Sequence, residues 1–350
     1  MIGQLPAPIT GPSAWSRADF ASEDSFVEQL QPSEVQEISD AADRFLDRGL
    51  PLEDVSTSNF QLGTYSAKLN RMRHDVLSGK GFSVLRGLPV DNWSREKSVT
   101  VFFGLGRYLG NARSQNAKGH LLGHVRDLGL ATSDPKVRIY QTTERQTFHT
   151  DSCDIVALLC LKNARSGGDS ALVSSMRIYN EMYHTCPDLL AELFHAFPTD
   201  RRGEIPDGKK SYFEIPVYNW HRNYLSVIYA RTYITSAQRL PGVRPTTERE
   251  VEALNMFDAL ANDERFNIFM RLQPGDMQFV HNHTILHDRT AFTDWDEPAK
   301  KRHLLRLWLA APDARPLPEV YAERYGSVEI GNRGGIVVPG TRLHVPLEAA

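Results

Sequence analysis

The feature that most constrains the fold is a continuous apolar run at residues 155–161, near the middle of the chain. By periodicity alone, this run fits either a buried helix or a strand that is covered on both faces. Its short length and its leading β-branched residues, Ile155 and Val156, favour the strand. The run therefore predicts a buried strand.

Helical patterns are concentrated early in the chain, and strand patterns dominate its middle and end. Helices are expected at 33–45, 65–77, 93–109, 176–183 and 187–194, and strands at 82–88, 212–218, 225–229, 276–280 and 303–309. Ser33 is the expected N-cap of the first helix, and the clearest helix opens at Thr247, with Glu250 reaching back to it. Together the patterns predict an α+β domain around a β-sandwich or jelly-roll core.

The chain of 350 residues and 39.5 kDa is long enough for one large core or two modest ones. No repeat, low-complexity tract or linker divides it, so we expect a single domain over residues 1–350. Residues 1–30, rich in Pro, Ser and Gly, are expected to form a surface arm. The formal charge of -3 and the pI near 6.5 give no electrostatic reason to expect nucleic acid or an anionic membrane as partner.

A few features of the sequence bear on the cellular compartment of the protein. The first residues lack a basic region followed by an apolar one, and no apolar run approaches the ~18 residues that span a bilayer. The cysteines, Cys153, Cys160 and Cys186, are odd in number and lack metal-knuckle spacing, which fits a reducing compartment. We expect a cytoplasmic protein that binds a small molecule, with a homo-oligomer left open.

A polar pair precedes the apolar run. In an extended segment, side chains two residues apart project from one face, so His149 and Asp151 can bind one ion while Thr150 points away. With one more histidine they would make the two-His-one-carboxylate set of non-haem Fe(II) oxygenases. Taken alone, a His-x-Asp pattern is more often ordinary polar surface or a hydrogen-bonded pair.

Three histidines, His281, His283 and His287, follow the strand expected at 276–280. They fit either a polar loop of solvated imidazoles or a metal site that one of them completes. Spacing does not choose, because His281 and His283 share a face in a strand, whereas His283 and His287 share one in a helix. Zinc also takes His and carboxylate ligands, although the His-Glu-x-x-His pattern of zinc hydrolases is absent.

Two arginines lie on the last expected strand or directly before it. Arg302 and Arg306 are four residues apart, so both face the same side of an extended segment. Guanidinium groups that face inward from an apolar strand are costly unless they meet an anion. The pair fits either a structural ion pair or two anion clamps, each matching a carboxylate bidentately.

Taken in order, four motifs resemble the Fe(II)/2-oxoglutarate-dependent dioxygenases related to taurine dioxygenase, the TauD/TfdA family. These motifs are His149-x-Asp151, Gly167-Gly168-Asp169-Ser170, Leu286-His287-Asp288-Arg289-Thr290-Ala291-Phe292 and Arg302-x-x-x-Arg306. The resemblance covers about residues 80–310 and includes the strand expected at 82–88. It implies a double-stranded β-helix (jelly-roll, cupin-like) core with flanking helices.

The resemblance also implies a metal site. His149, Asp151 and His287 match the iron ligands of the family, whereas His281 and His283 fall where the family has other polar residues. The segment 199–224 matches no motif.

Roles in binding the cosubstrate and substrate follow from the same resemblance. Arg302 matches the arginine that holds the distal carboxylate of 2-oxoglutarate, and Ser170 replaces a Thr or Ser that hydrogen-bonds this carboxylate. Arg306 falls where taurine dioxygenase grips the anionic group of its substrate.

The implied enzyme uses Fe(II), 2-oxoglutarate and O2 to oxidise an unactivated C–H bond, with release of succinate and CO2. Because Arg306 would bind an anion, we expect a small carboxylate-bearing substrate, such as an amino acid or a natural-product intermediate. Three polar residues that lie near the metal ligands in sequence are also expected to contact the substrate: Tyr140, Gln141 and Asn282. The alternatives are a non-catalytic β-helix protein that binds a small acid and a zinc-dependent hydrolase.

Overall fold

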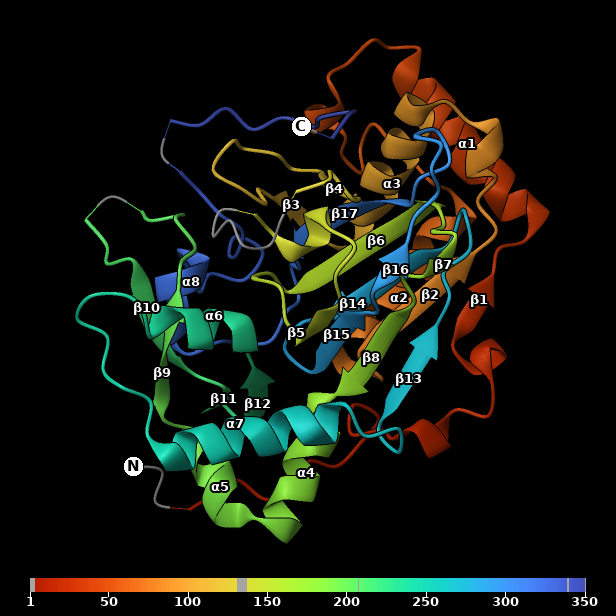
Figure 1. Ribbon diagram of the computed structural model, residues 1–350. Coiled ribbons are helices and arrows are strands. Elements are labelled where there is room, and N and C mark those ends of the chain that lie inside the picture. The colour runs from red at the N-terminus through yellow and green to blue at the C-terminus, as the bar shows by residue number, and fades with distance from the viewer. Residues whose placement is uncertain (1–3, 131–136, 207, 339, 350) are drawn as a thin grey trace.

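The computed structural model describes residues 4–130, 137–206, 208–338 and 340–349 (Figure 1). Its α-helices are α1 (Pro32–Leu46), α2 (Thr64–Ser78), α3 (Arg95–Leu109), α4 (Ser175–Thr185), α5 (Pro187–Glu192), α6 (Arg231–Ala237), α7 (Glu248–Ala261) and α8 (Ala322–Tyr325). Within this part of the chain, none of the helices combines the length and the hydrophobicity that a membrane span requires.

Two sheets form the centre of the fold. The larger has the order β1 (Val27–Gln29), β2 (Phe82–Arg86), β14 (Met277–His281), β6 (Ile155–Lys162), β17 (His303–Ala310) and β3 (Asn111–Arg113), with β4 (Gly123–Val125) also paired to β17. The smaller has the order β13 (Asn267–Met270), β8 (Ser170–Ser174), β15 (Ile285–Arg289) and β5 (Gln146–His149). The strand predicted at 155–161 is β6, in the interior of the larger sheet.

Three short antiparallel pairs lie outside these sheets. They are β9 (Ala196–Asp200) with β10 (Tyr212–Pro216), β11 (Tyr218–His221) with β12 (Tyr224–Val227), and β7 (Ser166–Gly167) with β16 (Phe292–Thr293).

The two sheets pack face to face, as in a jelly roll. One buried cluster joins Val156 and Leu304 of the larger sheet to Leu172 and Ile285 of the smaller. The predicted α+β fold with a jelly-roll core is therefore confirmed.

Helices cover the outer faces of both sheets (Figure 1). Phe45 of α1 and Phe102 of α3 share a buried cluster with Leu159 of β6. On the other side, Tyr179 of α4 and Phe257 of α7 pack in a cluster with strands β8 and β15. These amphipathic helices shield the apolar sheets and leave the centre for the site.

Details at the N-terminal end differ from the predictions. Helix α1 begins at Pro32 with Gln31 as its N-cap, so Ser33 lies inside the helix and does not cap it. Most described residues of the predicted surface arm are partly or fully exposed, and Trp15 and Phe26, 4% and 6% exposed, anchor it to the sheet. Residues 1–3 of that arm lie outside the described residues.

A buried ionic network connects the turn between β14 and β15 to Asp154. The carboxylate of Asp154 accepts hydrogen bonds from His283 Nε2 at 2.9 Å and from Ala311 N at 3.1 Å, and pairs with Arg333 Nη2 at 2.8 Å. His281 and His283 are both buried, so the alternative of solvated imidazoles is wrong for these two residues. Burial lowers the pKa of His283 to about 4, because its effect exceeds the opposite effect of the neighbouring Asp154 carboxylate. Burial also holds the pKa of His281 well below its usual value.

Stability is expected to fall below neutral pH, because His281 and His283 remain neutral in the folded protein. In the unfolded chain each titrates near pH 6.5, so below that pH the unfolded state binds more protons and is favoured. The free energy of unfolding should therefore be greatest above pH 6.5 and decrease toward pH 4, by up to about 1.4 kcal/mol per pH unit for each histidine. Urea titrations at several pH values measure this slope.

A suitable control is His74→Gln, because the side chain of His74 is 75% exposed. This variant should keep the pH dependence of the wild type. A wild-type free energy of unfolding that stays constant from pH 7.5 to 5.5 would contradict the prediction.

Candidate metal centre and its cavities

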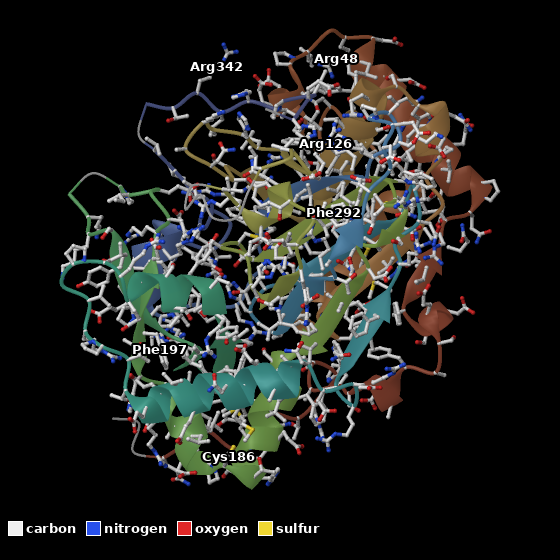
Figure 2. All side chains as sticks on the ribbon, viewed as in Figure 1. Arg48, Arg126, Cys186, Phe197, Phe292 and Arg342 are labelled. Atoms are coloured by element: carbon white, nitrogen blue, oxygen red, sulfur yellow. The ribbon has the colours of Figure 1, made fainter. Side chains whose placement is uncertain are left out.

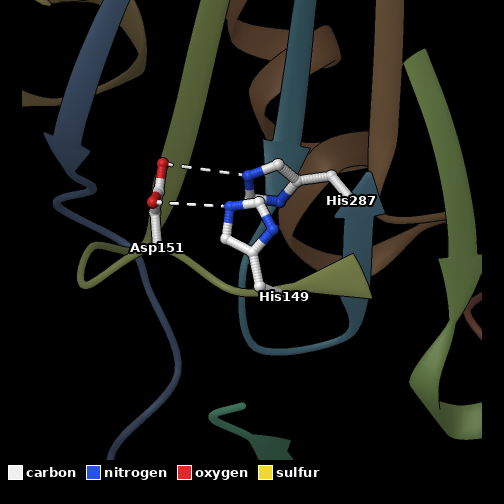
Figure 3. A group of neighbouring side chains, drawn as sticks. All are labelled: His149, Asp151 and His287. Carbon is white, nitrogen blue, oxygen red and sulfur yellow. Dashed lines mark ion pairs between the residues drawn. The ribbon is translucent and has the colours of Figure 1, made fainter. Parts of the chain in front are cut away.

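Three side chains converge between the sheets at one end of the smaller sheet (Figure 3). His149 ends β5 and lies directly opposite His287 of β15 in the antiparallel register. Asp151 follows β5, with Oδ1 3.9 Å from His149 Nε2 and Oδ2 3.8 Å from His287 Nε2. One potential ligand atom from each residue lies within 4.8 Å of the others. The structure therefore brings together the three residues predicted as metal ligands.

The imidazole of His149 presents a lone pair toward this centre. Its Nδ1 lies 2.8 Å from the carbonyl oxygen of Thr147, which can only accept, so Nδ1 carries the proton and donates. The other nitrogen, Nε2, is then unprotonated and accepts from Gln146 Nε2 at 2.8 Å. A backbone contact of this kind orients a histidine for metal binding.

Asp151 is held by several donors. Its Oδ2 accepts from Trp308 Nε1 at 2.8 Å and from Arg306 Nη1 at 3.4 Å, and its backbone N–H donates to Asn282 Oδ1 at 2.9 Å. Burial alone would raise the pKa of Asp151, but Arg306, the two histidines and the Trp308 hydrogen bond outweigh burial and hold it below its usual value.

His287 is neutral for a related reason. Burial, followed by the neighbouring His149, lowers the pKa of His287 to about 3. A neutral imidazole and an ionised carboxylate are the forms that bind a metal ion. The donor set thus fits a divalent metal without a change of protonation at His287 or Asp151.

A small cavity next to this centre contains an incompletely paired cation. Arg302 is only 4% exposed, and its Nη2 donates to the carbonyl oxygen of Gly168 at 3.3 Å. Its Nη1 is buried without a hydrogen-bond partner among the described residues. Burial lowers its pKa to about 10, so the guanidinium stays charged at neutral pH. Ser170 and His287 line the same cavity, in which a carboxylate would complete the pairing.

Arg289 is a second buried cation at this cavity, and its role was not predicted. Its Nη1 donates to Thr142 O at 2.9 Å, and its Nε is buried without a partner among the described residues. The guanidinium carbons of Arg289 and Arg302 lie 4.8 and 5.2 Å from the ring centre of Phe292, which is labelled near the middle of the molecule in Figure 2. Burial, reinforced by Arg302, lowers the pKa of Arg289 to about 9. The two cations make this end of the cavity strongly attractive to an anion.

A larger cavity of about 250 Å³ opens on the other side of the metal centre. Tyr140, Gln146, His149 and Arg306 line both this cavity and the smaller one. Of the candidate ligands, His149 lines both cavities, Asp151 the larger and His287 the smaller, so a molecule in each cavity would lie beside the same centre.

Arg306 lies at this junction. As predicted, it faces the same cavity as Arg302, and its guanidinium lies 4.7 Å from the ring centre of Tyr140. Its Nε donates to Gln115 Oε1 at 2.8 Å, and its Nη1 contacts Asp151. Arg306 thus has an internal carboxylate partner as well as a place in the cavity wall.

Two of the residues predicted to contact substrate do not line either cavity. Asn282 is fully buried and holds the backbone of Asp151. Gln141 belongs to a short 3-10 turn, Ile139–Gln141, and accepts from the N–H of Arg138 at 3.1 Å. The structure gives both residues supporting roles in place of the predicted ones, whereas Tyr140 does line the cavities.

Several cavity residues were missed. Trp308 lies two residues beyond Arg306 on β17, so strand alternation was a signal that could have found it. Gln146 gave no such signal, since it lies three positions before His149, an odd spacing that places the two side chains on opposite faces of a regular strand. A bulge in β5, where His149 faces His287 but Gln146 faces Arg289, turns both side chains to one side.

Comparisons with known proteins agree with this geometry. The family described as "Taurine catabolism dioxygenase TauD, TfdA family" matches residues 47–308. FR-33289 synthase of Streptomyces rubellomurinus (strain ATCC 31215) is 32% identical over 322 residues, which cover 91% of this chain and 95% of the synthase.

Solved structures share the fold at lower identity. Asparagine oxygenase in complex with Fe(II), 2S,3S-3-hydroxyasparagine and succinate has a TM-score of 0.64 at 18% identity, covering 81% of this chain and 93% of that chain. The non-heme iron oxygenase OrfP in complex with Fe and alpha-ketoglutaric acid has a TM-score of 0.59 at 14% identity, with 81% and 93% covered.

The family match covers most of the chain, and the synthase match covers nearly all of it. The predicted enzyme class is therefore confirmed, in place of the zinc hydrolase and the non-catalytic binding protein. The chain belongs to the TauD/TfdA family of Fe(II)- and 2-oxoglutarate-dependent dioxygenases.

Proposed function

We propose that the protein oxidises a C–H bond of a small carboxylate-bearing molecule, such as an amino acid or a natural-product intermediate, which binds in the larger cavity. Fe(II) would be held by His149, Asp151 and His287, and 2-oxoglutarate would bind in the smaller cavity. The single observation that supports this proposal most is the meeting of the two cavities at the three candidate ligands.

The ligand set suits Fe(II). Two imidazoles and one carboxylate on one side of a metal leave coordination positions open, as non-haem Fe(II) oxygenases require. Trp308 and Arg306 occupy Oδ2 of Asp151, so Oδ1 is the oxygen better placed to bind the ion. Gln146 would have to turn away from His149 Nε2 when the metal binds, because it now occupies the lone pair of that nitrogen.

Arg302 would hold the distal carboxylate of 2-oxoglutarate. Its buried Nη1 lacks an acceptor among the described residues, and Ser170 lines the same cavity with a hydroxyl that can donate. Arg289 adds positive charge at the same end through its position beside Phe292. The oxidant comes from iron, 2-oxoglutarate and O2, with release of succinate and CO2.

The rest of the site positions the reactants and limits water. Tyr140, Trp308 and Ile336 give the larger cavity apolar walls, which favour a carbon skeleton at the metal side. Among the similar proteins, asparagine oxygenase has been solved with 2S,3S-3-hydroxyasparagine and OrfP with (3S)-hydroxy-L-Arg, and FR-33289 synthase is named for the compound it makes. These relatives support a small amino acid or related intermediate as substrate.

The metal ligands can be tested by substitution. Replacing His149, Asp151 or His287 by Ala should weaken Fe(II) binding by at least about 100-fold, because each change removes one of three ligands. Anaerobic Fe(II) titration followed by metal analysis measures this loss, and succinate formation should disappear in parallel.

His195→Ala is the matched control, since His195 pairs with Glu192 outside both cavities. Its Fe(II) affinity should equal that of the wild type. Normal Fe(II) binding by His287→Ala, together with loss in His283→Ala, would mean that another histidine completes the site.

The cosubstrate pocket predicts the effect of two substitutions. Arg302→Ala should raise the required 2-oxoglutarate concentration by roughly two orders of magnitude, with Arg302→Lys intermediate. Gly168→Ala should act in the same direction, because a Cβ at residue 168 would lie 2.8 Å from Arg302 Nε. The 2-oxoglutarate dependence of succinate formation measures both effects.

Gly242→Ala is the control for Gly168→Ala. Gly242 has φ +76°, close to the +75° of Gly168, but a Cβ there would have no atom within 4 Å. The strain of a positive φ is thus matched, and only the contact with Arg302 differs. An unchanged 2-oxoglutarate requirement in Arg302→Ala would place the cosubstrate elsewhere.

The role of Arg306 can be determined by comparing 2-oxoglutarate turnover in the presence and in the absence of substrate. If it binds the substrate carboxylate, Arg306→Ala should keep 2-oxoglutarate turnover without substrate but lose its stimulation by substrate. Gln115→Ala, which removes the hydrogen bond to Arg306 Nε together with those from Gln115 Nε2 to Arg306 O and Leu121 O, should have a smaller effect of the same kind. Loss of both activities with normal Fe(II) binding would place Arg306 on the cosubstrate.

A further inference from the structure

The larger cavity contains more cationic than anionic side chains. Its arginines are Arg138, Arg202, Arg231, Arg306 and Arg324. Three of them already have carboxylate partners: Arg138 pairs with Glu204 at 2.8 Å, Arg231 with Asp258 at 2.8 Å and Arg306 with Asp151 at 3.4 Å. Arg202 and Arg324 have no ion-pair partner among the described residues.

Arg324 is fixed close to the metal centre. It comes from α8, and its Nε donates to Ser152 Oγ at 2.7 Å, next to the candidate ligand Asp151. Its terminal nitrogens make no hydrogen bond with the described residues. The side chain is therefore held through Nε, which leaves two nitrogens, each with two N–H donors, for a molecule in the cavity.

Arg202 lies in the same cavity wall in an unusual conformation. Its φ of 55° is in the left-handed region, and its backbone N–H donates to Asp200 Oδ1 at 2.7 Å, which holds that conformation. The guanidinium lies 5.6 Å from the ring centre of Tyr233, and its Nε is buried without a partner among the described residues. Its Nη2 donates to Val137 O at 3.3 Å, so the side chain is tethered at one nitrogen while its charge has no carboxylate partner among the described residues.

Both residues lie outside the motifs that this chain shares with the family. Arg324 lies beyond residue 308, where the match to the family ends. Arg202 belongs to the segment 199–224, in which no motif was found. The two arginines are thus separate from Arg302 and Arg306, whose roles follow from the family.

We propose that Arg324 and Arg202 together bind an oxyanion group of the substrate in the larger cavity. This inference rests on the proposed function and adds a position for negative charge on the substrate that is separate from the one tested at Arg306. A guanidinium pair suits a carboxylate or a tetrahedral phosphate-type or phosphonate-type group, and a neutral substrate would leave both cations unpaired. The group bound there lies on the side of Ser152, and the rest of the molecule would extend toward His149 and Asp151, which line the same cavity.

The test uses the protein loaded with Fe(II) and saturating 2-oxoglutarate under anaerobic conditions, so that the smaller cavity is filled. Propionate and methylphosphonate are titrated separately by calorimetry. The wild type should bind at least one of them, and Arg324→Gln and Arg202→Gln should each weaken that binding by about tenfold to a hundredfold. Arg324→Lys should retain part of the affinity, because it keeps the charge without the fork.

Arg231→Gln is the matched control, since Arg231 lines the same cavity but is already paired with Asp258 and Asn255. Its affinity for the probe should stay within about twofold of the wild type. Thermal melting and Fe(II) binding of each variant show whether it is folded and loaded.

The possible results separate the proposals. Preference for propionate over methylphosphonate, or the reverse, identifies the carboxylate or the tetrahedral group as the one recognised. No binding of either probe by the loaded wild type, or equal binding in Arg324→Gln, Arg202→Gln and Arg231→Gln, overturns the inference. Failure of the wild type to bind Fe(II) or 2-oxoglutarate would instead overturn the proposed function.

Discussion

The turn between β5 and β6, residues 150–154, carries the constraint on which the metal centre depends. It is held from several directions: Thr150 N donates to Tyr229 O, Asp151 N to Asn282 Oδ1, and Asp154 N to Leu309 O, while Ser152 accepts from Arg324. A carboxylate on a loop would ordinarily be mobile, but these hydrogen bonds fix the backbone on both sides of Asp151. The ligand geometry is therefore set before any ion arrives.

Two buried carboxylates in this turn have different surroundings. The difference explains why Asp154 has a structural role and Asp151 is the candidate metal ligand. Asp154 is saturated, because His283, Arg333 and Ala311 satisfy both of its oxygens. Oδ2 of Asp151 accepts a hydrogen bond from Trp308, whereas the nearest ring nitrogen to Oδ1 is Nε2 of His149, at 3.9 Å. An ion placed at Asp154 would have to replace internal partners, whereas one at Asp151 would add a missing one. This contrast favours His287 over His283 as the distal ligand.

Sequence reasoning succeeded where strands are regular and failed where they are not. Alternation along an extended chain correctly brought His149 beside Asp151, and directed Arg302 and Arg306 into one cavity. It missed Gln146, because the bulge in β5 changes the face on which that residue lies. Proximity in sequence misled for Asn282, since a turn residue beside a strand can point into the core as easily as into a cavity. Arg324 could not have been found, because only the folded chain brings α8 to Ser152.

The contacts of Ser152 have a consequence for the order in which the protein is built. Its hydroxyl accepts from Arg324, its carbonyl accepts from the N–H of Gly335 at 2.7 Å, and the nearby Asp154 pairs with Arg333. All three partners emerge from the ribosome long after the turn itself. The segment around Asp151 thus acquires its full support only once synthesis has passed Gly335, and until then a nascent chain carries the ligands without the frame that orients them.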